Sequence, residues 1–285
     1  MTYQTKHPPK LRFISAVLAL AMLLTLLPTT AFAADDGEKT DGDYTYKVNA
    51  DGTATIMDYT GSGGDIMIPE TLGGKSVTEI SRMKRDSGST TVTSITIPKS
   101  VKRIGDSAFN TFAALKKVAF AAGSELESIG KDAFHWCKVL EEIELPSSVK
   151  TIGESAFEKC EALKEVNFGS GVTRIGDRAF AECKALTSIT IPAQVTNIAR
   201  GAFSGCSALT AISLPSTIGS VPEAMFSYCS ALTTVTIPDG ITAIGDSAFT
   251  YCSSLTTVTI PASVTKIGRS AFWSTKLKTV NYGGS

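Results

Sequence analysis

The amino-acid sequence predicts a solenoid of the α/β class, rich in β-structure, in which 23-residue coils with parallel strands and short helical turns follow a small β-hairpin cap. Phenylalanine, short apolar stretches that end in proline, and glycine after isoleucine all recur in one phase. The phenylalanines are Phe109, then Phe134 after 25 residues, and then Phe157, Phe180, Phe203, Phe226, Phe249 and Phe272 at intervals of 23. One such unit cannot bury its own apolar stripe, whereas stacked units can, so the fixed period predicts stacked coils.

The first 33 residues have the layout of a secretory signal peptide. Three basic residues precede an apolar run of 14 residues from Ile14 to Leu27, and a short Ala-Phe-Ala sequence ends at Ala33. A membrane anchor is the alternative, but a helix that spans a bilayer needs about 20 apolar residues. We therefore assign residues 1–33 to a signal peptide cleaved after Ala33, and we expect a secreted or cell-surface product without membrane insertion after cleavage.

The next part of the chain is predicted to lead into the coils. Residues 34–43, ADDGEKTDGD, are polar and acidic, which predicts a disordered linker. Tyr44–Val48 and Thr53–Tyr59 flank a turn sequence that contains glycine, which predicts a β-hairpin. We assign residues 44–80 to an N-terminal β cap with the first coil, and residues 81–285 to the solenoid.

Each coil repeats the same order of elements, as in AFAECKALTSITIP from Ala179 to Pro192. The A-F-x-x-C segment is predicted to form a tight helical turn. The alternation through Ile189 and Ile191 predicts a short strand, which proline ends because it has no N–H for the ladder. A second short extended piece follows, for example Val264–Ile267.

A glycine follows the isoleucine of this second piece in most coils. Ala199 and Pro222 hold the same position in two coils, and proline keeps φ near −65°. A positive φ therefore does not explain these glycines, and we predict that they allow close packing between coils.

The units LTSITIPAQVTNIARGAFSGC and LTTVTIPASVTKIGRSAF resemble the BspA-type, or Treponema-type, leucine-rich repeats of exported bacterial proteins. The resemblance extends over residues 44–282 and includes a leader module with the sequences YTY, DGTATI and GKSVTEI. It implies a leucine-rich-repeat solenoid that binds macromolecules, above all proteins, as in adhesion to host or bacterial surface proteins, and it implies no enzymatic activity. A carbohydrate- or cell-wall-binding module without catalytic activity is the alternative function. The first coil departs from the pattern at Ser81–Thr91, where we expect a loose loop.

Composition and motifs argue against other classes of function. Residues 34–285 hold 24 Lys+Arg (27 − 3) against 27 Asp+Glu, a net charge near −3, which gives no reason to expect nucleic acid or an anionic membrane as partner. His135 is the one histidine outside the predicted signal peptide, and the sequence has no P-loop, H-E-x-x-H motif or nucleophile elbow. We therefore expect neither enzymatic activity nor a cofactor.

Six cysteines lie three residues after the phenylalanine of successive coils: Cys137, Cys160, Cys183, Cys206, Cys229 and Cys252. Zinc sites usually bring close cysteine pairs such as C-x2-C together, so no metal site is expected. Disulfides between adjacent coils are an alternative in an exported protein, although parallel Cβ directions disfavour them. We expect a structural ladder of buried, reduced thiols, because buried free cysteine behaves as a small apolar group.

Two surfaces are candidate sites for partner binding. The strand face consists of outward strand positions, among them Lys117, Glu142, Glu144, Glu165, Asn167, Thr190, Thr234, Thr236, Thr257 and Thr259. Solenoids commonly bind partners along such a face, although threonine also suits an exposed strand that binds nothing. The aromatic ridge consists of the turn residues Trp136, Tyr228, Tyr251 and Trp273. These rings could anchor a protein or stack on a sugar, although scattered exposed aromatic residues are also ordinary.

Overall fold

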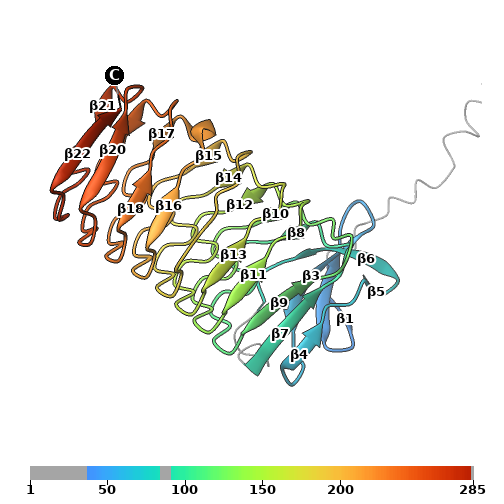
Figure 1. Cartoon of the computed structure of the whole chain (residues 1–285). Coiled ribbons are helices and arrows are strands. Elements are labelled where there is room, and N and C mark those ends of the chain that lie inside the picture. Colours follow the sequence, from blue (N-terminus) through green and yellow to red (C-terminus); the bar gives the residue numbers. More distant parts are fainter. Residues whose placement is uncertain (1–36, 84–90, 284–285) are drawn as a thin grey trace, which may run out of the picture. The chain divides into compact units, whose positions relative to one another are not determined.

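The computed structural model describes residues 37–83 and 91–283 (Figure 1). The predicted signal peptide, residues 1–33, lies outside the described residues, as does most of the loose loop predicted at Ser81–Thr91. The described chain winds into coils whose parallel strands are in register at the 23-residue period, so the predicted solenoid is confirmed.

The N-terminal cap is a small antiparallel sheet that continues into the coils. β1 (Lys39–Asp41) pairs with β2 (Tyr44–Val48), and β2 forms the predicted hairpin with β3 (Ala54–Tyr59). β3 then runs parallel to β6 (Lys75–Ile80), which folds back on β5 (Thr71–Leu72). The cap therefore joins the sheet of the first coil directly.

The described part of residues 34–43 is ordered, contrary to the prediction of a disordered linker. β1 pairs antiparallel with β2, with Lys39 opposite Tyr46. The Asp41 carboxylate accepts a hydrogen bond from the Gly73 N–H at 2.8 Å. Composition predicted disorder because a polar segment cannot bury a core, but the edge of β2 supplies backbone partners.

Beyond the cap, the coils contribute strands to two parallel rows. The first row contains β4 (Gly64–Met67), β7 (Val92–Ile97), β9 (Lys117–Phe120), β11 (Glu142–Glu144), β13 (Glu165–Asn167), β16 (Ala211–Ser213), β18 (Thr234–Thr236), β20 (Thr257–Pro261) and β22 (Thr279–Gly283). The second row continues from β6 with β8 (Arg103–Ile104), β10 (Ser128–Ile129), β12 (Thr151–Ile152), β14 (Arg174–Ile175), β15 (Asn197–Ile198), β17 (Ser220–Val221), β19 (Ala243–Ile244) and β21 (Lys266–Ile267). The 3-10 helix η2 (Ser216–Ile218) lies between β16 and β17.

The A-F-x-x-C segments are chains of β-turns, so the predicted short helical turns are wrong in detail. The Cys137 N–H bonds within its turn to the Phe134 carbonyl at 3.1 Å, whereas the Phe134 N–H bonds to the Ala156 carbonyl of the next coil at 2.7 Å. The Trp136 N–H likewise bonds to Glu158 of the next coil at 2.9 Å, and Trp136 has a φ of 64°. An α-helix would direct these N–H groups to carbonyls of its own turn. These backbone hydrogen bonds instead link each turn to the corresponding turn of the next coil.

The phenylalanines form the centre of the core. The rings of Phe109, Phe134, Phe157, Phe180, Phe203, Phe226 and Phe249 are fully buried and, with Phe272, stack at centroid distances from 5.0 to 5.8 Å. Burial of one such side chain is worth about 1.5–3 kcal/mol. One ring per coil therefore stabilises the stack at every repeat.

The glycines of the second row pack closely between coils, as predicted. A Cβ on Gly153 would lie 2.6 Å from the carbonyl carbon of Gly130, and the Gly153 N–H donates to the Ile129 carbonyl at 2.8 Å. At the same position Pro222 has no N–H to donate. The second row accordingly ends at β15 and resumes at β17.

The first row is also interrupted. No ladder joins β9 to β11, and residues 187–191, between β13 and β16, form no strand. The predicted strand through Ile189 and Ile191 is therefore wrong, although both side chains are buried. In the coils before these two gaps, Phe120 and Phe168 occupy a position where the other coils, except the last with Tyr282, carry leucine or isoleucine. We attribute the gaps to these larger rings, because close-packed coils cannot absorb additional volume.

Candidate functional site

The strand face carries the residues predicted for partner binding on the outward side of the first row. On β11, Glu142 and Glu144 are exposed, whereas Ile143 between them is 2% exposed. The sheet pairs Glu142 with Glu165, and Glu144 with Asn167, on β11 and β13. The alternation of each strand therefore places these polar side chains together on one surface.

The predicted threonines lie farther along the same face. Thr234 and Thr236 on β18 and Thr257 and Thr259 on β20 are exposed. Thr190 is exposed too, but it belongs to the segment that forms no strand. The segment that contains Thr190 therefore separates the carboxylates of β11 and β13 from the threonines of β18 and β20.

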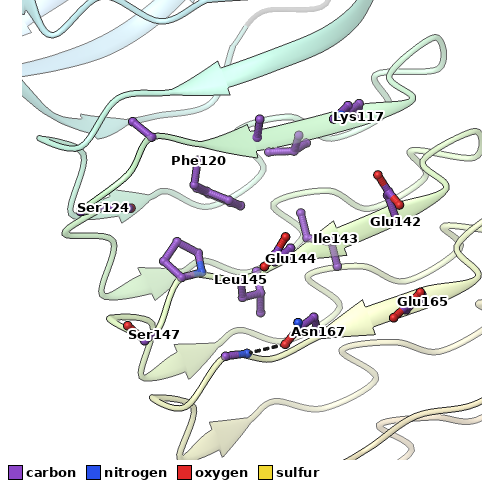
Figure 2. Close-up of a pocket in the computed structure, with 16 residues that line it drawn as sticks. Lys117, Phe120, Ser124, Glu142, Ile143, Glu144, Leu145, Ser147, Glu165 and Asn167 are labelled. Atoms are coloured by element: carbon purple, nitrogen blue, oxygen red, sulfur yellow. Dashed lines mark hydrogen bonds between the residues drawn. The ribbon is translucent and has the colours of Figure 1, made fainter.

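A groove of about 800 Å³ opens in the strand face along β9, β11 and β13 (Figure 2). Lys117, Glu142 and Glu165 lie toward one end of the groove, and Ser124 and Ser147 lie toward the other. Of the predicted residues, Lys117, Glu142, Glu144, Glu165 and Asn167 line the groove. The apolar part of the lining comes from residues such as Val118, Ala119, Phe120, Ile143, Leu145 and Pro146.

Within the groove, no strand ladder joins β9 to β11. The Ala121 N–H donates to the Ile97 carbonyl of the preceding coil at 2.9 Å, whereas the Leu145 N–H donates to the Asn167 carbonyl of the following coil at 2.8 Å. The strands β9 and β11 are thereby held to opposite neighbours. The groove lies along the gap between β9 and β11 and extends to β13.

Sequence reasoning missed the groove and the residues Phe120, Gly123 and Ser147 in its lining. A signal was present, because Phe109 and Phe134 are 25 residues apart instead of 23. The two additional residues fall in the loop around Gly123, which has a φ of 73°. A local lengthening of the repeat therefore marks the position of the groove.

Three carboxylates in the groove have no basic partner within the described residues. No salt bridge of 4.0 Å or less there includes Glu142, Glu144 or Glu165. The adjacent Glu141, which does not line the groove, pairs with Lys164 at 2.9 Å, and the hydrogen bond from Lys164 lowers the pKa of its carboxyl. With Lys117 also in its lining, the groove presents a net negative charge beside an apolar wall.

The aromatic ridge is gathered at three of its four predicted positions. The rings of Tyr228 and Tyr251 stack at a centroid distance of 4.7 Å with planes 20° apart, and Trp273 meets Tyr251 edge-on at 4.8 Å. Tyr228 and Trp273 are each 56% exposed. We call these three residues the aromatic cluster.

Trp136, the fourth residue of the aromatic ridge, lies apart from the aromatic cluster, and two lysine side chains already lie over its ring. The ammonium groups of Lys138 and Lys159 lie 4.8 and 5.0 Å from its ring centroid. The same turn position in the three coils between Trp136 and the aromatic cluster is held by Lys159, Glu182 and Gly205, all with positive φ.

All six cysteines are buried and have free thiols. Each thiol donates a hydrogen bond to the phenylalanine carbonyl of the preceding coil, at 3.1 to 3.3 Å. Burial raises the pKa of Cys137, Cys206 and Cys252 to about 12 and that of the other three well above its usual value. Protonated, enclosed thiols of this kind are weak nucleophiles and weak metal ligands.

Titratable groups near His135 are engaged in structural pairs. Glu158 accepts hydrogen bonds of 2.6 Å from both Arg178 and Ser155, and these outweigh the effect of burial and lower the pKa of its carboxyl. His135 lies 3.8 Å from Asp132. The part of the chain that the structure describes contains no group of three His, Cys, Asp or Glu side chains able to hold a metal, and no helix there has the length and hydropathy to cross a membrane.

A family model, the BspA type leucine-rich repeat region, matches the chain in six copies over residues 87–199 and 173–285. A comparison with curated proteins finds no match. Among solved structures, the chain is similar to a leucine-rich repeat protein from Bacteroides ovatus ATCC 8483, with 28% identity, a TM-score of 0.68, and 86% of this chain and 71% of that chain covered.

Two further solved structures share the fold. The leucine-rich repeat protein of T. pallidum has 25% identity and a TM-score of 0.56, with 77% of this chain and 91% of that chain covered. The pneumococcal vaccine antigen PcpA has 22% identity and a TM-score of 0.53, with 87% and 82% covered, and shows the fold alone. The family model spans well over half of the sequence, and the coils have the period that it describes, so this protein belongs to the BspA-type leucine-rich repeat family.

Proposed function

We propose that this protein binds a protein ligand at the bacterial or host surface through the groove in its strand face, without catalysing a reaction. The observation that carries the proposal is the groove of about 800 Å³, whose three carboxylates form no salt bridge with the basic residues that the structure describes. A concave site that combines apolar lining with a few polar groups is typical of ligand recognition. Membership of a leucine-rich repeat family supports a binding role, since solenoids offer extended surfaces to their partners.

The proposed setting is outside the bacterial cell. In this proposal residues 1–33 are a cleaved signal peptide, residues 44–80 are the cap and first coil, and residues 81–285 are the binding solenoid. Adhesion to a host or bacterial surface protein is the proposed biological role. The acidic groove favours a ligand that carries basic side chains, because complementary charge speeds encounter and excludes acidic competitors.

The test is capture of surface proteins by the mature chain, followed by an affinity measurement with the captured protein after purification. The variant combines Glu142→Gln, Glu144→Gln and Glu165→Gln, which removes the charge and keeps the shape. Thr234→Ala, Thr257→Ala and Thr259→Ala form the matched control on the far part of the same face. We expect at least tenfold weaker binding for the first variant and unchanged binding for the control. Equal affinity of both variants would refute the groove as the binding site.

Carbohydrate or cell-wall binding is the second candidate function, and the aromatic cluster is the observation that favours it. Exposed aromatic rings supply apolar faces on which sugar rings can stack. Replacement of Tyr228 and Tyr251 by alanine would then abolish binding to cell-wall or host glycans. The groove variants would leave that binding unchanged, which separates the two functions.

A further inference from the structure

The aromatic cluster ends beside an open position on the turns. Glu182, Gly205, Tyr228 and Tyr251 hold the same position in four successive coils. Hydrogen bonds establish this order, since the Gly205 N–H donates to the Ser227 carbonyl at 2.7 Å. Tyr251 covers one face of the Tyr228 ring at 4.7 Å, whereas Gly205, in the coil on the other side, has no side chain.

Glu182 borders the open position from the opposite side. A Cβ on Gly205 would lie 3.1 Å from the Cγ atom of Glu182, so the aliphatic part of the glutamate side chain lies next to the glycine. Arg178 is the cation nearest to the Glu182 carboxylate, at 3.9 Å, but it pairs more closely with Glu158, at 2.6 Å. Glu182 therefore retains the capacity to accept hydrogen bonds from another cation.

At the same turn position earlier in the chain, an aromatic ring is covered by a side chain of the next coil. Trp136 and Lys159 occupy it in adjacent coils, and the Lys159 ammonium lies 5.0 Å from the ring centroid of Trp136. A cation over an aromatic face is attracted by the charge distribution of the ring. Tyr228 receives no such cation from the coil of Gly205.

We infer that the open position over Gly205 binds an arginine side chain of a protein ligand, which stacks on Tyr228 and pairs with Glu182. Coils about 4.8 Å apart leave a gap of roughly two spacings between the positions of Tyr228 and Glu182, which suits one planar group. The guanidinium stacks on aromatic faces and bonds carboxylates with two N–H groups, so arginine fits better than lysine. This site lies on the turns and does not depend on the groove in the strand face.

A sugar suits this position less well. Tyr228 and Tyr251 cover each other, and Trp273 meets Tyr251 with its edge, so the cluster does not offer ring faces side by side. The open face of Tyr228 adjoins a carboxylate, which favours a cation. Glycan binding is therefore an outcome to be distinguished by the test.

The test uses nuclear magnetic resonance on the mature protein labelled with ¹⁵N-glycine, with the Gly205 amide as the reporter. The probe is a blocked Gly-Arg-Gly peptide, and the control peptide carries citrulline, which is neutral and has nearly the same shape. We expect a saturable shift of the Gly205 signal with the arginine peptide at about millimolar concentration, and at least fivefold weaker binding of the citrulline peptide.

Variants assign the contacts. Tyr228→Leu and Glu182→Gln should each weaken binding of the arginine peptide at least fivefold, whereas Tyr228→Phe, which keeps the ring, should bind within twofold of the parent. Gly205→Lys should block the peptide by filling the position from within, as Lys159 does beside Trp136; because this variant lacks the Gly205 amide, its binding is measured by saturation-transfer difference on the peptide signals. Lysine is tolerated in this backbone conformation, since Lys159 has a φ of 61°. Thermal unfolding confirms that each variant is folded.

Three results would overturn the inference: equal binding of the arginine and citrulline peptides, no shift of Gly205 with either peptide, or a shift with an N-acetylglucosamine trimer but not with the arginine peptide. Loss of ligand binding in the groove variants addresses the other site only. The two proposals therefore succeed or fail independently.

Discussion

At the scale of single residues, position in the coil decides the chemistry of a side chain. Cys206 donates its thiol hydrogen to the Phe180 carbonyl at 3.3 Å and is buried with a pKa raised to about 12. A residue type that is often nucleophilic serves here to fill the turn and to satisfy a carbonyl of the preceding coil. The sequence period predicted burial of the thiols, but it could not identify the carbonyl partner, which depends on how the turns stack.

The raised thiol pKa makes stability depend on alkaline pH. Burial raises the folded-state pKa of Cys206 from 9.0 to about 12, so its stabilising contribution is complete below pH 9 and is lost as the pH rises toward 12. The unfolded chain releases the proton first. We expect the stability difference between the parent and Cys206→Ala to fall by about 1 kcal/mol between pH 9 and pH 10, and by about 1.4 kcal/mol per pH unit beyond that. Urea unfolding at pH 8, 9 and 10 measures this, and parallel stability curves would contradict it.

At the scale of elements, the alternation along strands and the parallel stacking of coils were predictable, but the interruptions of the strand rows were not. The alternation along β11 and β13 follows from the sequence of one coil, whereas the gap after β9 depends on Phe120 and on the lengthened loop that follows it. β1 escaped prediction for a similar reason, because its stability comes from the edge of β2. The turns were predicted as helical because one coil does not reveal that its N–H groups bond to the next.

Restoring one N–H should rejoin the second row. Pro222→Ala introduces a donor where Ala199, one coil earlier, donates to the Ile175 carbonyl at 2.9 Å. We expect the amide created at position 222 to bond to the Ile198 carbonyl and to exchange with solvent as slowly as the Ala199 amide. Stability should change by less than about 1 kcal/mol, because the new hydrogen bond offsets the greater freedom of the unfolded chain. Fast exchange at position 222 would show that another constraint separates β15 from β17.

At the scale of the whole molecule, both proposed sites lie at exceptions to the repeat. The groove lies at the one interval of 25 residues between successive phenylalanines, and the arginine site lies where a glycine replaces a side chain on the turns. The regular positions build the solenoid, with one buried phenylalanine per coil. The family pattern therefore predicts the fold, whereas departures from it indicate where this protein can recognise a partner.

Removal of one whole coil would separate the contribution of the repeats to folding from that of the exceptional positions to binding. Deletion of residues 184–206 joins Cys183 to Ser207 and keeps the spacing between Phe180 and Phe226 at 23 residues. Because each coil contacts its neighbours only, we expect the shortened chain to fold with an unchanged circular dichroism spectrum per residue. It should keep the groove but lose the open position, since the coil of Tyr228 would then follow that of Glu182 directly. Saturation-transfer difference on the peptide signals, which needs no Gly205 reporter, should show that binding of the arginine peptide disappears while binding at the groove persists. Arginine binding that survives the deletion would place that site elsewhere.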